Sequence, residues 1–161
     1  MFKVTAADIA TYFAFDPLRE ADLRAVDRMI RRAAPTLKRW FVTGTPSGKP
    51  GMKMTMIGYG RFTYTVQSSP QPIDWPIIGL ALQKSYLSLY LSARQDGATL
   101  LSSYADRLGK VSVSKIGAMT FAHAADIDRD EFVAMLRALE AGLGNGRLAL
   151  RYGRAKDPPS T

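Results

Sequence analysis

The sequence predicts an α+β fold, in which a curved, mainly antiparallel sheet of about five to six strands packs with N-terminal and C-terminal helices. Apolar residues recur at helical spacing near both ends of the chain, within residues 6–35 and 96–143. Residues 40–92 instead hold runs of aromatic and branched residues that are separated by Gly, Pro and Ser. The links between these runs are too short for the helices that a doubly wound parallel sheet requires.

Two helices are expected before residue 36. The segment "AADIATYFAF" (6–15) places Ile9, Tyr12 and Phe13 on one side of a short helix. The segment "FDPLREADLRAVDRMIRRAAP" (15–35) offers Asp16 as the N-cap and Pro17 as the first helical residue. Its apolar stripe continues to Pro35 and consists of Leu23, Val26, Ile30 and Ala33.

Four successive strands are expected after residue 40, over residues 52–60, 61–67, 75–83 and 85–93. The longest link between them is "SSPQPIDWP" (68–76), which is rich in strand breakers. In "SYLSLYLSA" (85–93) three leucines alternate with tyrosines and serines, so we expect a leucine face in the core and a tyrosine and serine face on the other side. "QKS" (83–85) is then a hairpin turn with Lys84 at or near its tip.

A helix, a strand and a final helix are expected in the rest of the chain. Residues 96–110 return to helical spacing, and Gly109 stands where a left-handed residue would end that helix. The segment "GKVSVSKIGAMTF" (109–121) predicts one strand, with Val113, Lys115, Gly117, Met119 and Phe121 on one face. The segment "DIDRDEFVAMLRALEAG" (126–142) predicts a helix, because Asp128 and Glu131 have the spacing of a capping box. Its apolar stripe consists of Phe132, Leu136, Leu139 and Leu143.

The chain predicts a single domain over residues 1–145 and a basic, flexible tail over residues 146–161. Its 47% of hydrophobic residues suffices for a core of ordinary size. The N-terminus lacks the pattern of a signal peptide, and no stretch approaches about 18 uninterrupted apolar residues, so we expect a soluble, cytoplasmic protein without membrane contact. An exposed strand edge leaves homodimerisation open.

The residue types exclude several kinds of active site. Without cysteine there are no thiolate zinc sites, disulfides or cysteine nucleophiles. His123 is the single histidine, and no nucleophile elbow lies near it, so we expect an ordinary histidine at the end of a strand. We therefore expect no cofactor, no bound metal and no catalytic residue.

Two segments resemble ligand-binding loops but differ from them in detail. In "RLGKVSVSK" (107–115) Gly109 and Lys110 end a helix and precede a strand, whereas a phosphate loop opens into a helix. "DIDRDE" (126–131) begins like a calcium loop, but Glu131 stands where glycine is needed and Arg137 stands where a bidentate glutamate is needed. Its acidic residues are expected to cap the final helix.

The formal net charge of +8 favours anionic partners, although the charge is not gathered into one block. One basic run could contact nucleic-acid phosphates. It spans Pro35, carries no nucleic-acid-binding signature and lies partly on the outer face of a helix, so we favour a solvated face over a nucleic-acid interface. The run consists of Arg28, Arg31, Arg32, Lys38 and Arg39.

The candidate contacts for an anionic ligand are Lys115, Lys110 and Lys84. Tyr59 and Tyr90 are the aromatic side chains that Lys115 would approach across a concave sheet. The alternative is that these lysines are surface residues, and that the segment around Lys115 is a strand with its turn.

The second half of the chain resembles the YdhG-like family, known as domain of unknown function 1801. The segments that carry the resemblance are "SYLSLYLSA", "LLSSYADRLGK", "SKIGAMTF" and "AADIDRDEFVAMLRAL"; it covers residues 15–142 and is most specific over residues 84–136. The resemblance implies a small α+β domain with a curved antiparallel sheet, similar in general shape to frataxin-like proteins. Most members have no assigned activity, and some relatives are described as frataxin-like iron chaperones, a role that requires an accessible acidic surface.

We therefore predict a non-enzymatic domain that binds a small ligand or a protein, because no catalytic or nucleotide-binding motif is complete. The expected partner is an anionic small molecule or a protein. Three alternatives remain open at this point: a frataxin-like iron-handling protein, an enzyme of unknown type with a pocket on the sheet, and a weak nucleic-acid binder.

Overall fold

Six strands form one antiparallel sheet in the computed structural model, which describes residues 4–43, 54–66 and 69–150. From one edge to the other, the strands are β1 (Arg39–Val42), β2 (Met56–Val66), β3 (Ser69–Leu82), β4 (Leu87–Leu91), β8 (Ala118–Phe121) and β7 (Ser112–Val113). A smaller sheet has the order β6 (Ala98–Thr99), β5 (Ala93–Gln95) and β9 (Ala149–Leu150). The predicted α+β class with a mainly antiparallel sheet is confirmed.

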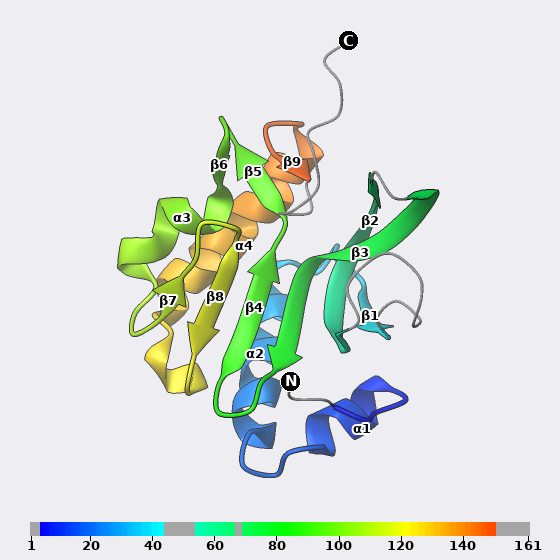
Figure 1. The fold of residues 1–161 in the computed structure, drawn as a ribbon. Helices are drawn as coiled ribbons and strands as arrows, with labels where there is room; N and C mark the ends of the chain where they lie inside the picture. The colour runs from blue at the N-terminus through cyan, green and yellow to red at the C-terminus, as the bar shows by residue number, and fades with distance from the viewer. Residues whose placement is uncertain (1–3, 44–53, 67–68, 151–161) are drawn as a thin grey trace.

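Two long helices lie behind the large sheet in Figure 1, α2 (Glu20–Ala33) and α4 (Arg129–Gly144). The short helices are α1 (Ile9–Ala14), α3 (Leu100–Tyr104) and the 3-10 turns η1 (Ala105–Arg107) and η2 (Ala124–Asp126). Within the described part of the chain, no helix is long and apolar enough to cross a membrane.

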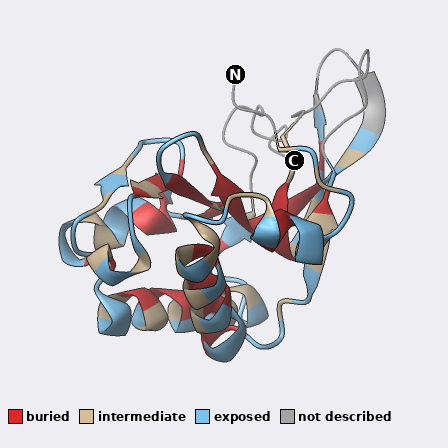
Figure 2. Cartoon of the chain, turned by 90° about the horizontal axis from the view of Figure 1, so that it is seen from below, coloured by how far each residue is buried: buried red, intermediate tan, exposed pale blue. Residues whose placement is uncertain are grey.

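The main core fills the space between the sheet and these helices, as the buried residues in Figure 2 show. Leu87, Leu89 and Leu91 of β4 are buried in it, which confirms the predicted leucine face. The predicted helical stripes are buried there as well, and each fully buried leucine contributes about 1.5–3 kcal/mol relative to exposure. The stripe residues in this core are Leu23, Val26, Ile30 and Ala33 of α2 and Phe132, Leu136 and Leu139 of α4.

The opposite face of the sheet carries a second, smaller apolar cluster. Ser88 of β4 lies on this face, directly across from Ala81 of β3, and both residues are buried. The tyrosine and serine face is therefore separated from the leucine face as predicted, and it is partly buried: Ser88 is buried, Tyr90 is half-buried and Tyr86 is exposed. The cluster consists of Val42, Met56, Tyr64, Trp75 and Ala81.

The two strands predicted over residues 52–67 form one strand, β2, in their described part, because Gly60 does not interrupt it; residues 52–53 and 67 lie outside the described residues. The Gly60 amide donates to the Lys38 carbonyl at 2.9 Å, and its carbonyl accepts the Trp40 indole N–H at 2.7 Å. Gly60 has no paired residue in β3, but the pairing of β2 with β3 keeps the same register before and after it, from Ile57 to Tyr64, although its φ is 72°.

The expected link at residues 68–76 is also wrong, because β3 already begins at Ser69. Its prolines are tolerated for a geometric reason: β4 pairs only with residues 78–82 of β3. The earlier part of β3 has β2 as its single described neighbour, and proline is compatible with such an edge because no second ladder needs its missing N–H.

The segment 109–121 is a hairpin and not the single strand that we predicted. Val113 of β7 pairs with Met119 of β8, and the turn between them closes with a Ser114 amide to Ala118 carbonyl bond of 2.8 Å. Gly117 allows this turn because its φ is 92° and its missing Cβ would lie 2.6 Å from the Leu91 carbonyl oxygen. Lys115 is consequently an exposed turn residue.

The helix starts differ from the predictions in two places. Helix α2 begins at Glu20 and not at Pro17, because the Asp16 carboxylate accepts the Leu18 amide at 3.0 Å and caps a turn ahead of the helix. Helix α3 begins only at Leu100, since residues 96–99 form the turn and strand β6. The C-terminal helix begins as predicted after Asp128, whose carboxylate accepts the Glu131 amide at 3.1 Å.

The chain stays packed beyond the predicted boundary at residue 145. Leu148 is buried in the main core and lies against Gly142 of α4. Strand β9 then pairs with β5, with Leu150 opposite Ala93. Residues 151–161 of the expected tail lie outside the described residues.

Candidate functional site

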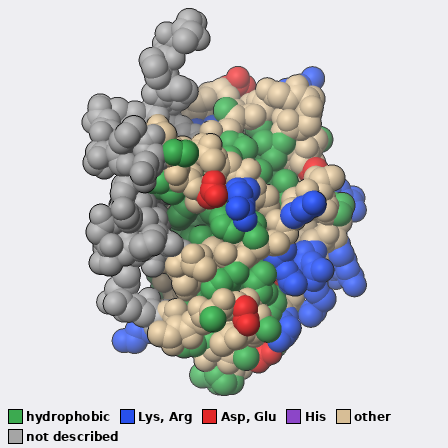
Figure 3. Space-filling model, turned by 90° about the vertical axis from the view of Figure 1, so that its right-hand side faces the viewer, with side chains coloured by type: hydrophobic (Ala, Val, Ile, Leu, Met, Phe, Trp, Pro, Cys, Tyr) green, Lys and Arg blue, Asp and Glu red, His purple; other side chains and the backbone are tan. Residues whose placement is uncertain are grey.

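Five basic side chains line one hollow of about 480 Å³ where α2 turns into β1. We call it the basic hollow, and its lining is Arg28, Arg31, Arg32, Pro35, Leu37, Lys38 and Arg39. No acidic side chain belongs to this lining among the residues that the structure describes. Figure 3 shows Lys and Arg side chains gathered side by side on this side of the molecule. The basic run is exposed, as predicted, but its members also converge on a concave surface.

Local geometry brings the two parts of the run together. Arg28, Arg31 and Arg32 share one face of α2, because residues three and four apart are neighbours on a helix. Pro35 cannot continue the helix, and the Leu37 amide closes a turn onto the Ala34 carbonyl at 3.1 Å. Pairing of β1 with β2 then fixes Lys38 and Arg39 beside the end of the helix.

A contact with α4 holds the loop that forms one wall of the basic hollow. The Thr36 amide donates to a carboxylate oxygen of Glu140 at 2.9 Å, and the Thr36 hydroxyl donates to the same oxygen. The hydroxyl and then the amide hold the pKa of Glu140 below its ordinary value. The loop therefore has a defined position relative to both helices.

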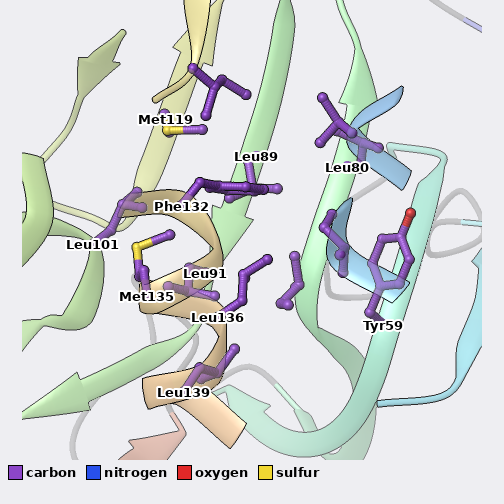
Figure 4. Packing of buried hydrophobic residues seen from close by; sticks show 14 of the residues in the cluster. Tyr59, Leu80, Leu89, Leu91, Leu101, Met119, Phe132, Met135, Leu136 and Leu139 are labelled. Atoms are coloured by element: carbon purple, nitrogen blue, oxygen red, sulfur yellow. The ribbon is translucent and has the colours of Figure 1, made fainter. Parts of the chain in front are cut away.

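A buried carboxylate orients part of the basic lining from below. Asp27 is 4% exposed, and it accepts the Tyr59 hydroxyl at 2.6 Å and an Arg39 guanidinium N–H at 3.0 Å. Arg31 approaches the same carboxylate at 3.8 Å. Tyr59 itself lies among the packed core residues in Figure 4. The Asp27 carboxylate thus links the core to two cations of the hollow.

The other three cations have no such partner. Within residues 4–43, 54–66 and 69–150, the side chains of Arg28, Arg32 and Lys38 form no ion pair. Like charges at helix positions i and i+4, such as Arg28 and Arg32, destabilise a helix by about 0.2–0.5 kcal/mol. Arg31 and Arg32 also lie in the last turn of α2, where the macrodipole favours cations. An anion in the hollow would reduce the repulsion among these cations.

The site residues predicted from the sequence do not form one site. Tyr59 lies on the helix-covered face of the sheet, whereas Tyr90 pairs with Gly79 and lies on the opposite face. Lys115 is in the turn that contacts the Leu91 end of β4. Lys110 lines a shallow depression of about 430 Å³ near Phe121, at the other end of β4.

Lys84 is exposed in the turn between β3 and β4, at the same end of β4 as that depression. Gly109 has a φ of 96° and lies just after η1 and its C-cap Leu108, so the left-handed residue predicted at the end of this helical segment is present. The backbone there pairs with the segment before α4, through a Lys110 amide to Asp126 carbonyl bond of 2.8 Å.

The remaining motifs have structural partners. Asp126 accepts the His123 amide at 3.2 Å, and Asp128 caps α4. The His123 ring Nδ1 lies 3.2 Å from an Asp22 carboxylate oxygen, and the Ala124 amide donates to the other oxygen at 3.0 Å. In the part of the chain that the structure describes, no group of three or more His, Asp or Glu side chains could hold a metal ion.

Comparisons of the chain with protein-family models, with curated proteins and with solved structures find no match. The resemblance to the YdhG-like family therefore stays a prediction. The sequence signal for the basic hollow was the run from Arg28 to Arg39, but a run shows neither concavity nor which cations have partners.

Stability should fall in alkaline solution because two tyrosines are buried. Burial raises the pKa of Tyr59 well above its usual value, and the charge of Asp27 and their hydrogen bond raise it further. Burial also raises the pKa of Tyr12, whose hydroxyl accepts the Leu82 amide. Above about pH 10 the unfolded chain loses these protons while the folded chain keeps them, so the free energy of unfolding falls by about 1.4 kcal/mol per pH unit for each group.

Urea unfolding between pH 8 and pH 11 measures this slope. We expect Tyr59→Phe to reduce the alkaline slope, although it already lowers stability at pH 8 through the lost hydrogen bond. An unchanged slope in Tyr59→Phe would show that Tyr59 ionises equally in both states.

Proposed function

We propose that this protein is a non-enzymatic binding domain of the YdhG-like type that acts in the cytoplasm and takes an anionic ligand in the basic hollow. The observation that carries the proposal is the convergence of five cationic side chains on one hollow, three of them without an ion-pair partner among the described residues. Proteins commonly use such concave basic surfaces to concentrate anions.

The ordered lining of the hollow favours a binding site over the alternative of a merely solvated basic face. Asp27 fixes Arg39 from the core side, and Glu140 fixes the loop at Thr36. Part of the lining is therefore ordered before a ligand arrives, which reduces the entropy lost on binding. The lining also contains no aromatic side chain among the described residues, so nucleic-acid bases would find no stacking surface there.

Calorimetric titration with inorganic tripolyphosphate at low salt tests the proposal. We expect binding that weakens as salt rises, because exposed charges are screened over about 10 Å at 0.1 M ionic strength. The double variant Arg28→Gln and Lys38→Gln should bind about tenfold more weakly, since each exposed charge pair contributes about 0.2–1 kcal/mol. Neither residue has an ion-pair partner to lose in the part of the chain that is described, so the fold should be unaffected.

A matched control removes two cations elsewhere. Lys110→Gln with Lys115→Gln changes the net charge by the same amount but leaves the basic hollow intact. It should bind tripolyphosphate within twofold of the parent. Equal weakening in both double variants would mean that net charge alone attracts the anion, and the proposed site would be wrong.

A further inference from the structure

A second hollow of about 450 Å³ lies between α2 and α4. We call it the interhelical hollow. Its lining comes from one stretch of each helix and consists of Met29, Arg32, Ala33, Arg129, Asp130, Val133, Ala134 and Arg137. It is adjacent to the basic hollow, because Arg32 belongs to both linings.

The two hollows differ in chemistry. The basic hollow is lined mostly by cations, whereas the interhelical hollow also has apolar side chains from Met29, Ala33, Val133 and Ala134. The alanines are short, so they leave space between the two helices. Arg129 and Arg137 have no ion-pair partner among the described residues, and Asp130 is the single acidic member of this lining.

We infer that the ligand of this surface is an acidic segment of a protein partner that carries apolar side chains between its carboxylates. This inference rests on the proposed function and names the class of ligand. Carboxylates of the segment pair with the arginines and with Lys38, while an apolar side chain enters the interhelical hollow against Met29 and Val133. A phosphate chain would match only the cations, because it has no apolar group for the interhelical hollow.

The two hollows are also close enough together for one short peptide segment to contact both. Arg28 and Arg32 are one helical turn apart, and so are Arg129 and Val133 on the facing helix. A segment that crosses Arg32 therefore reaches both hollows with a few residues. Binding of this kind follows the recognition of acidic motifs by arginine clusters, with the apolar contact adding specificity.

Fluorescence anisotropy with labelled short peptides tests the inference on the full chain. The first probe has the sequence EELEELEE, and the second replaces both leucines by serine. We expect the leucine peptide to bind about tenfold more tightly, since its apolar side chains are removed from water in the interhelical hollow. Equal affinity of the two peptides would overturn the inference.

A matched pair of variants locates the apolar contact. Ala134→Glu places a charged side chain in the interhelical hollow, and Ala141→Glu makes the same change at another exposed position of α4 outside both linings. Ala134→Glu should weaken the leucine peptide about tenfold relative to Ala141→Glu. An equal effect of the two substitutions would contradict the inference, because only the long-range charge would then matter.

Tripolyphosphate separates this inference from the proposed function. If Ala134→Glu and Ala141→Glu bind tripolyphosphate with equal affinity, and Arg28→Gln with Lys38→Gln binds it more weakly, the basic hollow is an anion site. This conclusion does not depend on the affinities of the two peptides. If the double variant Arg28→Gln with Lys38→Gln binds tripolyphosphate and both peptides as tightly as the parent does, the proposed function and the inference are both wrong. An oligonucleotide that binds more tightly than the leucine peptide would also overturn the acidic-segment assignment.

Discussion

Replacing Asp27 by alanine is expected to lower the free energy of unfolding by about 3 kcal/mol. The substitution leaves the Tyr59 hydroxyl buried without its acceptor and removes the carboxylate that Arg39 contacts at 3.0 Å. Because the Arg39 side chain is 29% exposed, water compensates part of its loss, and the estimate stays below that for a fully buried ion pair. Urea unfolding at neutral pH measures the change.

A surface pair provides the control for this substitution. Asp74 pairs with Arg61 at 3.5 Å, and both side chains are more than half exposed. Asp74→Ala should therefore lower stability by less than about 1 kcal/mol. A double-mutant cycle of Asp27→Ala with Tyr59→Phe should show a coupling of about 1 kcal/mol or more, and additive effects would show that the hydrogen bond does not stabilise the fold.

Replacing Gly109 by alanine is expected to lower the free energy of unfolding by about 3 kcal/mol. The φ of 96° disfavours any residue with a Cβ, and that Cβ would collide with the carbonyl oxygen of Asp126. Relief of the collision would separate the backbones that are joined by the Lys110 amide to Asp126 carbonyl bond and the Asp128 amide to Leu108 carbonyl bond, each 2.8 Å long. Thermal or urea unfolding reports the loss.

Gly97 provides the control that distinguishes backbone strain from the collision of the added Cβ. Its φ is 81°, but apart from Gly97 and its two neighbours in the chain, no atom of the described residues lies within 4 Å of the position where its Cβ would be. Gly97→Ala should therefore show the backbone strain alone, about 1 kcal/mol. If Gly109→Ala is no more destabilising than Gly97→Ala, the close approach to Asp126 does not constrain the fold.

Periodic patterns in the sequence predicted the core well because burial repeats with the local structure. The alternation of Leu87, Leu89 and Leu91 fixes which face of β4 is buried, and the stripe that includes Phe132 and Leu136 does the same for α4. Such patterns depend only on neighbours in the chain, so they can be read without knowing the tertiary contacts.

The secondary-structure predictions were wrong at two glycines, because glycine adopts several backbone conformations. Gly60 looks like a strand break but continues β2, because β1 satisfies its hydrogen bonds. Gly117 looks like a strand residue but forms a turn, because it lies against the Leu91 carbonyl. Both outcomes depend on residues that are distant in sequence.

The candidate site was not predicted from the sequence, because we interpreted its basic run as a solvated face and placed the ligand contacts at Lys115, Lys110 and Lys84. The run from Arg28 to Arg39 is visible in the sequence, whereas the hollow requires the turn at Pro35 and the pairing of β1 with β2. No local pattern in the sequence marks Asp27, the buried acceptor beneath the hollow. Its role depends on Tyr59, which is brought to it by a strand.

The pairing of β9 with β5 has a consequence for synthesis of the chain on the ribosome. Leu150 is made after Ala93, and at about 5–20 residues per second the interval between them is roughly 3 to 11 s. During this time β5 has its local partner β6 but exposes the edge that β9 will cover. An uncovered edge can pair with another chain, and the arrival of β9 removes this edge of β5.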